Sequence, residues 1–352
     1  MDKKVEPKRG LHSVDGRAAS KTSEELEKLR HQAHKHLQAK EWHEASTAFS
    51  ELNLCDEEDV DALLGLALAL DRLGNYQKMY DIARSATDID SSSALALACK
   101  ARALQKLERI SEATIANDQA LLLDTNLALA WFNRCGQQLL QNHPEEALRY
   151  AERAIELDPS DARTMCNKAL ALLHMNHLYE ALDAVNQSLD LDPDFLLSLQ
   201  TKGEILRRYG RFEEVIVLME RALEIAPDDV AALNLKASAL RTTGQFDRLL
   251  ETTQHLMLLA PESPLSWDYH ISALRGTSHF EEANEVVEQV LEFDPTNVRY
   301  WMIKADNLYR LQHYREAVSS AEHALQIDDE YPPARRIHEK AMRMMYQQKR
   351  KR

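Results

Sequence analysis

Five arginines in the second half of the sequence have the spacing and the chemistry of a binding surface. Three of them recur at one constant interval, a fourth adjoins the first, and a fifth lies one position off that interval. They are Arg207, Arg241, Arg275, Arg208 and Arg310. A guanidinium group donates paired hydrogen bonds that match a carboxylate or a phosphate, so this set predicts a site for an acidic ligand. The alternative is pairing inside the protein, with acids such as Glu204, Asp268 and Asp306.

Two asparagines share the same spacing earlier in the chain. Asn133 and Asn167 are separated by the interval that separates Arg207 from Arg241. A carboxamide both donates and accepts hydrogen bonds, which suits the binding of an extended peptide backbone. Contacts with neighbouring helices or with water are the alternative role.

The sequence contains no arrangement typical of an enzyme. The phosphate loops GxGxxG and GxxxxGK and the catalytic motifs GxSxG and HExxH are absent. The best metal candidate is HQAHKH, residues 31–36, in which His31 and His34 share a helix face. A structural zinc site needs four ligands, and no cysteine pair or acidic partner stands at a suitable spacing. We therefore expect no catalysis, no cofactor and no metal site.

Charge is unevenly distributed along the chain. Its 352 residues carry a net charge of −14, although basic residues outnumber acidic ones at both ends, in 1–22 and in 343–352. The stretch between these ends is therefore more acidic than the chain as a whole. Because an acidic surface is repelled by phosphate backbones, nucleic acid is not an expected partner. No stretch approaches the roughly 18 apolar residues of a membrane span.

A repeat of constant length runs through most of the sequence. Prolines recur at this spacing, and the same register divides residues 26–331 into nine units without insertion or deletion. The prolines are Pro159, Pro193, Pro227, Pro261 and Pro295. The units are 26–59, 60–93, 94–127, 128–161, 162–195, 196–229, 230–263, 264–297 and 298–331.

Each unit has the pattern of two helices. In the fifth unit, residues 162–175 have apolar residues at helical spacing, residues 176–178 form a break, and a second helix follows. The Asp-Pro pair at its close ends that helix, because proline disfavours helical geometry in the residue before it. Small residues at the eighth and twentieth positions, such as Ala169 and Ala181, allow two antiparallel helices to approach closely.

These positions resemble those of the tetratricopeptide-repeat family over residues 26–331. The resemblance rests on tryptophan at the fourth position, an aromatic residue before an EEA-like segment as in HFEEA, and a late alanine in the second helix. Examples are Trp131, Trp267, Trp301, Ala120, Ala154, Ala222 and Ala324. The family's early glycine is present only as Gly203, and the first three units and the ninth lack the closing proline.

The resemblance implies an all-α fold, a right-handed superhelical α-solenoid of nine tandem 34-residue helix-turn-helix repeats. Residues 332–348 read as a C-terminal capping helix, in which Ile337 and Ala341 cover the last unit. Residues 1–22 are expected to form a disordered tail and residues 349–352 a basic tail. We expect the array to be one cooperative solenoid rather than several domains.

By the same resemblance, the first helix of each unit lines a concave groove that binds peptides. Units two to four present an apolar stretch there, and units six to nine present the arginines with other polar residues. The lysine and asparagine set with which family members hold chaperone C-termini is missing, so docking of that kind is not expected. The predicted partner-binding residues are Asn133, Asn167, Gln200, Arg207, Arg208, Asn234, Arg241, Tyr269, Arg275, Arg310 and Phe132.

The residues and the resemblance together predict a non-catalytic scaffold or adaptor that binds a protein or an extended peptide with an acidic segment. The alternatives are an obligate structural subunit of a larger complex, and a targeting or regulatory subunit of a separately encoded enzyme. The expected location is the cytoplasm. The basic C-terminal residues QQKRKR make the nucleus the alternative location.

Overall fold

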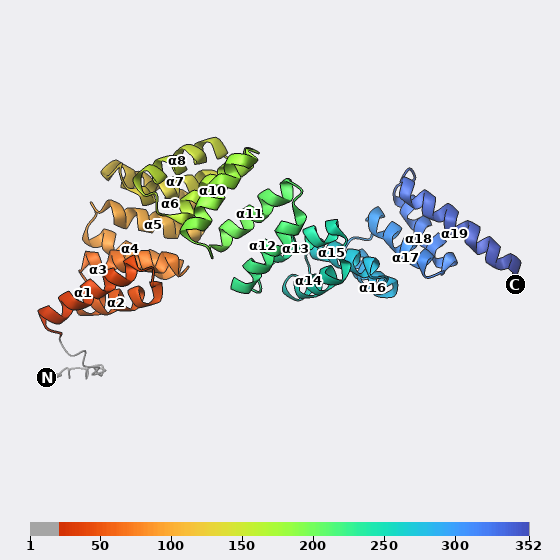
Figure 1. Ribbon diagram of the computed structural model, residues 1–352, viewed down its shortest axis with the longest axis horizontal. Helices are drawn as coiled ribbons and strands as arrows, with labels where there is room; N and C mark the ends of the chain where they lie inside the picture. Colours follow the sequence, from red (N-terminus) through yellow and green to blue (C-terminus); the bar gives the residue numbers. More distant parts are fainter. Residues whose placement is uncertain (1–20, 352) are drawn as a thin grey trace, which may run out of the picture. The chain divides into compact units, whose positions relative to one another are not determined.

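The computed structural model describes residues 21–351, and the regular structure of this part of the chain is α-helical throughout (Figure 1). It forms 19 helices, arranged as nine antiparallel pairs followed by a single helix. The prediction of an all-α fold of helix-turn-helix repeats is therefore confirmed. The predicted tail at residues 1–22 lies, apart from its last two residues, outside the described part of the chain.

The first helices of the pairs begin at a constant interval along the chain, from the second pair onward. The first helices are α1 (Ser23–Gln38), α3 (Val60–Arg72), α5 (Ala94–Lys106), α7 (Ala128–Leu140), α9 (Ala162–His174), α11 (Leu196–Arg208), α13 (Val230–Thr243), α15 (Pro264–Gly276) and α17 (Val298–Arg310).

The second helices keep the same spacing. They are α2 (Trp42–Cys55), α4 (Tyr76–Ile89), α6 (Ile110–Leu123), α8 (Pro144–Leu157), α10 (Leu178–Leu191), α12 (Phe212–Ile225), α14 (Phe246–Leu259), α16 (Phe280–Phe293) and α18 (Tyr314–Ile327). The last helix, α19, spans Pro332–Lys351. In the fifth pair, α9 ends one residue before the sequence pattern predicts and α10 begins at Leu178, a residue that the pattern assigns to the break.

The described chain divides into two compact units on either side of the bond between Pro159 and Ser160. The first unit contains α1–α8 and the second contains α9–α19. In each unit every helix packs against the next one along the chain, and successive first helices also contact each other, for example α3 with α5 and α11 with α13.

Short polar side chains start many of the first helices. The side chains of Asp59, Ser93 and Asp229 each accept a hydrogen bond from a backbone N–H of the first turn of α3, α5 and α13. Such a bond satisfies one of the four N–H groups that a helix leaves without a partner at its N-terminus. The polar residue before each of these helices therefore fixes where the helix begins.

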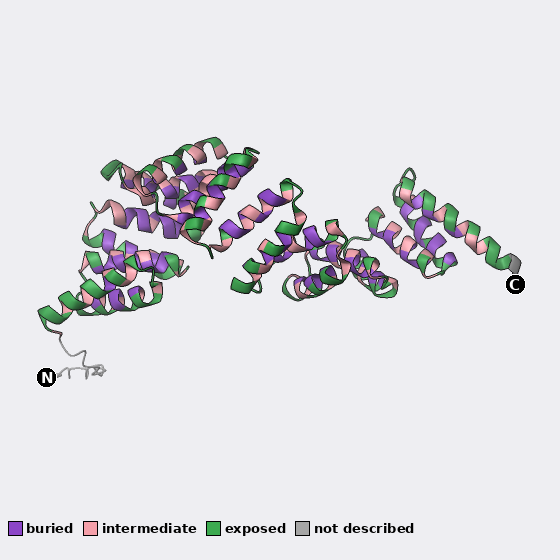
Figure 2. Cartoon of the chain, viewed as in Figure 1, coloured by how far each residue is buried: buried purple, intermediate pink, exposed green. Residues whose placement is uncertain are grey.

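The core of the first unit is built from small residues that let helices touch and from a few large ones that fill the space between them. Figure 2 shows that buried residues recur along the helices of this unit. Ala67, Ala101 and Ala113 are fully buried at the helix contacts. Phe49 is also fully buried, and a Cβ atom at Gly65 would lie only 2.3 Å from its ring. A side chain of that size contributes about 2–3 kcal/mol by leaving water, so Gly65 is needed to admit it.

The second unit has the same construction and ends on α19. Val215, Leu240 and Leu249 are fully buried between α11–α14. On α19, Ile337 and Ala341 are buried against the apolar residues of α17 and α18. This helix covers the apolar surface that the last pair would otherwise leave open to water.

One backbone conformation joins the two helices of every pair. The fifteenth residue of each repeat has φ between 58° and 74°, in the left-handed region. Glycine, which adopts this region without strain, holds the position only three times. The residues are Lys40, Gly74, Glu108, Asn142, Asn176, Gly210, Gly244, Ser278 and Gln312. The residue that follows donates its backbone N–H to a carbonyl oxygen of the first helix, as Arg109 donates to Leu104 at 2.9 Å. This hydrogen bond is typical of a Schellman motif at the end of a helix.

We expect Glu108→Gly to raise the free energy of unfolding by about 1 kcal/mol, because the left-handed backbone then carries no Cβ penalty. Denaturant unfolding followed by circular dichroism measures it. Gly74→Ala is the matched control. A Cβ atom there meets no atom within 4 Å, so the substitution adds only the strain of a left-handed backbone. It should lower the free energy of unfolding. Equal stability of both variants and the parent would contradict this account of the turn.

Candidate functional site

The candidate site is the side of the first helices in the second unit that carries the predicted arginines, here called the first-helix face of α11, α13, α15 and α17. Contacts between neighbouring repeats fix the register of this face. Gln200 of α11 donates to the Asp229 carboxylate before α13 at 2.7 Å, and Arg275 of α15 pairs with Asp306 of α17. Gln200 thus contacts the last residue of its own repeat, directly before α13, and Arg275 contacts a residue that stands three positions earlier in the next repeat.

Arg207 and Arg208 share one carboxylate. Arg207 donates through Nε and Nη2 to the two oxygens of Glu204, at 2.7 and 2.8 Å, and Arg208 donates through Nε at 3.1 Å. Arg208 also donates to the Leu173 carbonyl oxygen at 3.1 Å, near the end of α9. Partial burial raises the pKa of Glu204, but the bonds from the two arginines together lower it more, so the pKa lies below its ordinary value.

Arg275 and Arg310 share a second carboxylate. Both donate to the same oxygen of Asp306, Arg310 through Nε at 3.1 Å. The Arg310 guanidinium also lies over the ring of Phe280, 5.4 Å from its centre. The Arg275 Nε is buried without a hydrogen-bond acceptor among the described residues. Each of these two arginines therefore keeps part of its donor capacity uncommitted.

Arg241, midway between these clusters in the sequence, rests on an aromatic ring. Its guanidinium carbon lies 4.7 Å from the centre of the Tyr269 ring, a cation–π distance. Within the described part of the chain, no carboxylate lies within ion-pair distance of Arg241. The positions that supply acids to its neighbours hold serine here: Ser238 stands where α11 has Glu204, and Ser272 stands where α17 has Asp306.

The third acid of this face pairs with residues outside the predicted set. Asp268 accepts from Arg299 at 2.8 Å and from the Tyr300 hydroxyl at 2.9 Å. Burial and the bond to Asp268 raise the pKa of Tyr300 to about 12. The suggested pairing of Asp268 with one of the five arginines is therefore wrong, because the next first helix supplies both of its partners.

The amide side chains differ in what they can offer. Gln200 is held by Asp229, which at the same time caps α13. Asn234 is half-buried, and its Oδ1 lacks a hydrogen-bond partner among the described residues. Asn167 is half-buried on α9. Gln200 thus has a structural role, whereas the acceptor of Asn234 has no partner among the described residues but is itself buried.

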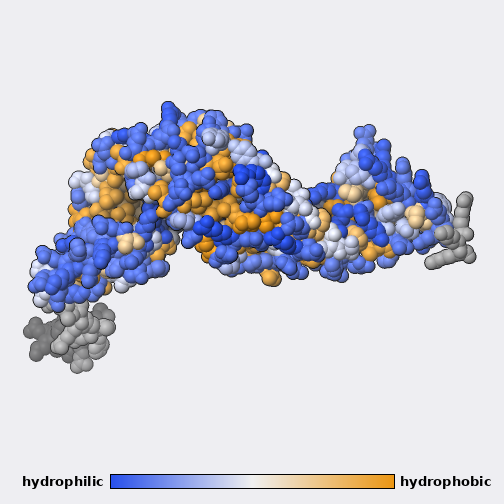
Figure 3. Space-filling view, in the orientation of Figure 1, coloured by the Kyte–Doolittle hydropathy of each residue, from blue (hydrophilic) through white to orange (hydrophobic). Residues whose placement is uncertain are grey.

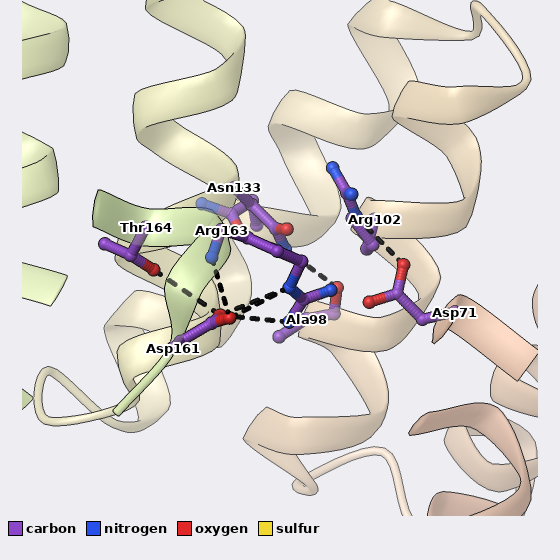
Figure 4. A network of polar contacts seen from close by, with 8 residues as sticks. Asp71, Ala98, Arg102, Asn133, Asp161, Arg163 and Thr164 are labelled. Carbon is purple, nitrogen blue, oxygen red and sulfur yellow. Dashed lines mark hydrogen bonds and ion pairs between the residues drawn. The ribbon is translucent and has the colours of Figure 1, made fainter. Parts of the chain in front are cut away.

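Asn133 lies inside the first unit. It is fully buried, and its Nδ2 donates to the Ala98 carbonyl oxygen at 2.9 Å (Figure 4). The same Nδ2 also donates to Asn117 Oδ1 at 3.2 Å. This is the helix contact named above as the alternative to a ligand role. Because the Asn133 side chain is buried, water and ligands do not reach it. Asn133 therefore does not join Asn167 in an exposed binding surface.

The predicted apolar stretch of the first unit contains buried polar groups. Phe132 is 4% exposed, and the Arg102 guanidinium carbon lies 4.8 Å from its ring centre. Arg102 also donates through Nε to Asp71 at 3.1 Å, and both side chains are buried (Figure 4). Gln105 on α5 and Gln137 on α7 are buried as well. Polar groups are therefore buried within this stretch, and the apolar character of its exposed surface stays a prediction.

The Asp71–Arg102 pair occupies the same repeat positions as the Arg275–Asp306 pair, with the charges exchanged. In both pairs the twelfth residue of one repeat contacts the ninth residue of the next. Both pairs could have been predicted from the sequence, because residues of opposite charge stand at these two positions of neighbouring repeats.

The histidine segment shows no metal geometry. His34 Nε2 lies 2.9 Å from Asp61 Oδ2, and His36 pairs with Glu41. Within residues 21–351, no three side chains of histidine, cysteine, aspartate or glutamate are arranged to hold a metal ion. Over the same residues, no helix combines the length and the apolar character needed to cross a membrane.

Comparison with known proteins agrees with this architecture. Models of the tetratricopeptide repeat match residues 128–161 and residues 162–195. No curated protein matches the chain significantly. Among solved structures, Pseudomonas aeruginosa PilF is similar with a TM-score of 0.51 and 23% identity, over 61% of this chain and 97% of its own. PilW, a type IV pilus biogenesis factor, is similar with a TM-score of 0.50 and 18% identity, over 59% and 96%.

At these identities the structural likeness concerns the fold alone. The repeated helix pairs define an all-α repeat protein of the solenoid-like class. The matched repeat models, on units that share their register and helix boundaries with the rest, place the chain in the tetratricopeptide-repeat family. Proteins of this family generally mediate interactions between proteins.

The buried ion pair of the first unit yields a stability prediction. Asp71→Ala should lower the free energy of unfolding by about 3 kcal/mol, because it leaves the Arg102 charge buried without its carboxylate. Glu24→Ala is the control, since Glu24 pairs with Lys28 in an exposed pair worth less than about 1 kcal/mol. Denaturant titration measures both, and similar losses for the two variants would contradict a structural role for the buried pair.

Proposed function

We propose that this protein is a non-catalytic scaffold or adaptor that binds an acidic segment of a partner protein on the first-helix face of its second unit. The observation that carries the proposal is the charge of that face. Five arginines stand along it, and only two carboxylates, Glu204 and Asp306, pair with them among the described residues. These five arginines thus outnumber their acidic partners in a chain whose net charge is −14.

The overall acidity of the chain does not prevent this binding. At physiological ionic strength, charges more than about 8 Å apart are largely screened where solvent reaches them. A partner's carboxylates at contact distance therefore respond to the arginines beside them rather than to distant acids. Guanidinium groups also hold carboxylates through two parallel hydrogen bonds, which adds orientation to attraction.

Other groups on the first helices suit a peptide. Leu197 and Leu265, at the N-terminal ends of α11 and α15, are 40% and 44% exposed and offer apolar contact. The non-catalytic assignment is supported by the family models, which match a repeat rather than an enzyme domain.

Exposed apolar residues on the second helices favour a second candidate, an obligate subunit held by its outer surface. On α6, Ile115 and Leu122 stand two helical turns apart, hence on one helix face, and are 60% and 84% exposed. Figure 3 shows hydrophobic patches among mainly hydrophilic residues. Self-association of the purified chain in light scattering would favour this candidate. The alternative of a targeting or regulatory subunit is compatible with both candidates, because either surface can hold a separately encoded enzyme.

The residue bounds of the nine units and of the capping helix stay predictions. The location in the cytoplasm, with the nucleus as the alternative, also stays a prediction.

The test is a pull-down from native lysate read by mass spectrometry. A variant with Arg207, Arg241 and Arg275 changed to glutamate should lose the partner that the parent retains. The control changes Arg221, Arg248 and Arg315 on the second helices of the same unit to glutamate, which alters the net charge equally, and it should keep that partner. Circular dichroism checks that both variants are folded. A partner retained by the first variant, or lost equally from both, would contradict the proposal.

A further inference from the structure

Among the five arginines of the first-helix face, Arg241 is the one without a carboxylate partner within the described residues. Its side chain is exposed, whereas Tyr269 beneath it is only 5% exposed and belongs to the core with Leu240 and Leu249. A ring fixed in the core cannot move away, so it gives the guanidinium a defined resting place. The stacking also restricts the rotamers of the arginine before any ligand arrives.

The stacked geometry leaves the hydrogen-bond donors of Arg241 available. A guanidinium group donates in its own plane, and contact with a ring occupies the face of that plane rather than its edge. No described carboxylate lies within ion-pair distance of it. Its neighbours differ, because Arg207 is held in a fork by Glu204 and Arg275 is tied to Asp306.

A carboxylate neighbours Arg207 but not Arg241. Hydrogen bonds to Glu204 are the main cause of the raised pKa of Arg207. Arg207 on α11 and Arg241 on α13 stand at the same position of neighbouring repeats. Of these two arginines, only Arg207 has a carboxylate partner among the described residues.

We infer, building on the proposed function, that Arg241 stacked on Tyr269 is the point at which the partner segment places one anionic group, a carboxylate or a phosphate. The group lies against the edge of the guanidinium and takes two hydrogen bonds from it. The other four arginines of the face, each sharing a carboxylate, orient the segment and add attraction. One acidic residue of the partner therefore contributes more to binding than the acids around it.

The test observes the arginine side chains directly and needs no identified partner. The Nε–Hε resonances of the ¹⁵N-labelled protein are recorded by NMR while inorganic phosphate or acetate is added. Sodium chloride additions of equal ionic strength provide the reference. Arg241→Ala, Arg207→Ala and Arg275→Ala assign the three resonances by their disappearance, and the backbone amide spectrum of each variant reports its folding.

We expect the Arg241 resonance to shift with phosphate or acetate beyond its shift in chloride, while the resonances of Arg207 and Arg275 move little. A larger response to phosphate assigns the site to a phosphorylated side chain, and a larger response to acetate assigns it to an aspartate or glutamate. Arg241→Lys keeps the charge without the fork, so the backbone amide resonances around residue 241 should no longer distinguish either anion from chloride.

Equal shifts of all three resonances, or no shift beyond that of chloride, would overturn the inference. Loss of the partner by the triple glutamate variant would then still support an acidic partner held by the whole face. Retention of the partner by that variant would instead remove the proposed function itself. The two failures are therefore distinguishable.

Discussion

The structure depends on one constraint, the close contact of antiparallel helices at buried small residues. Ala67, Ala101 and Ala237 stand at the same position of their repeats and are fully buried. Because this contact recurs from repeat to repeat, it fixes how far each first helix is displaced against the next. The twelfth residue of one repeat then meets the ninth of the following repeat, as Asp71 meets Arg102. Packing in the core thus decides which polar residues on the first helices become neighbours.

The contact between the twelfth and the ninth positions of neighbouring repeats has a different role in each unit. In the first unit it holds Asp71 and Arg102 in a buried pair, with the ring of Phe132 over the guanidinium. A buried pair of this kind is costly to break, so it ties neighbouring repeats together. In the second unit the charges are exchanged, and Arg275 and Asp306 are partly exposed. There the arginines of the first-helix face outnumber their acidic partners. This excess leaves guanidinium donors for the acidic segment that we propose as the ligand.

Much of the fold was predictable from the sequence, because proline spacing and apolar periodicity report directly on helix ends and packed faces. The turns were not, since Lys40, Glu108 and Gln312 do not reveal a left-handed backbone as glycine does. Within the candidate site, the arginines are where the spacing placed them, but their partners depend on rotamers. Arg207 turns back to its own helix, whereas Arg275 reaches the next one. The burial of Asn133 likewise follows from packing around it, which an isolated position in the repeat does not show.

The central claim, that the second unit attracts an acidic segment, is tested most directly by fluorescence anisotropy with labelled peptides. The peptides are matched in length and apolar content and differ only in net charge, and each is titrated at low and at physiological salt. The account predicts that affinity rises with the negative charge of the peptide and falls as salt is added, because contacts between guanidinium and carboxylate groups are screened. Affinity that is independent of peptide charge, or that favours basic peptides, would contradict it.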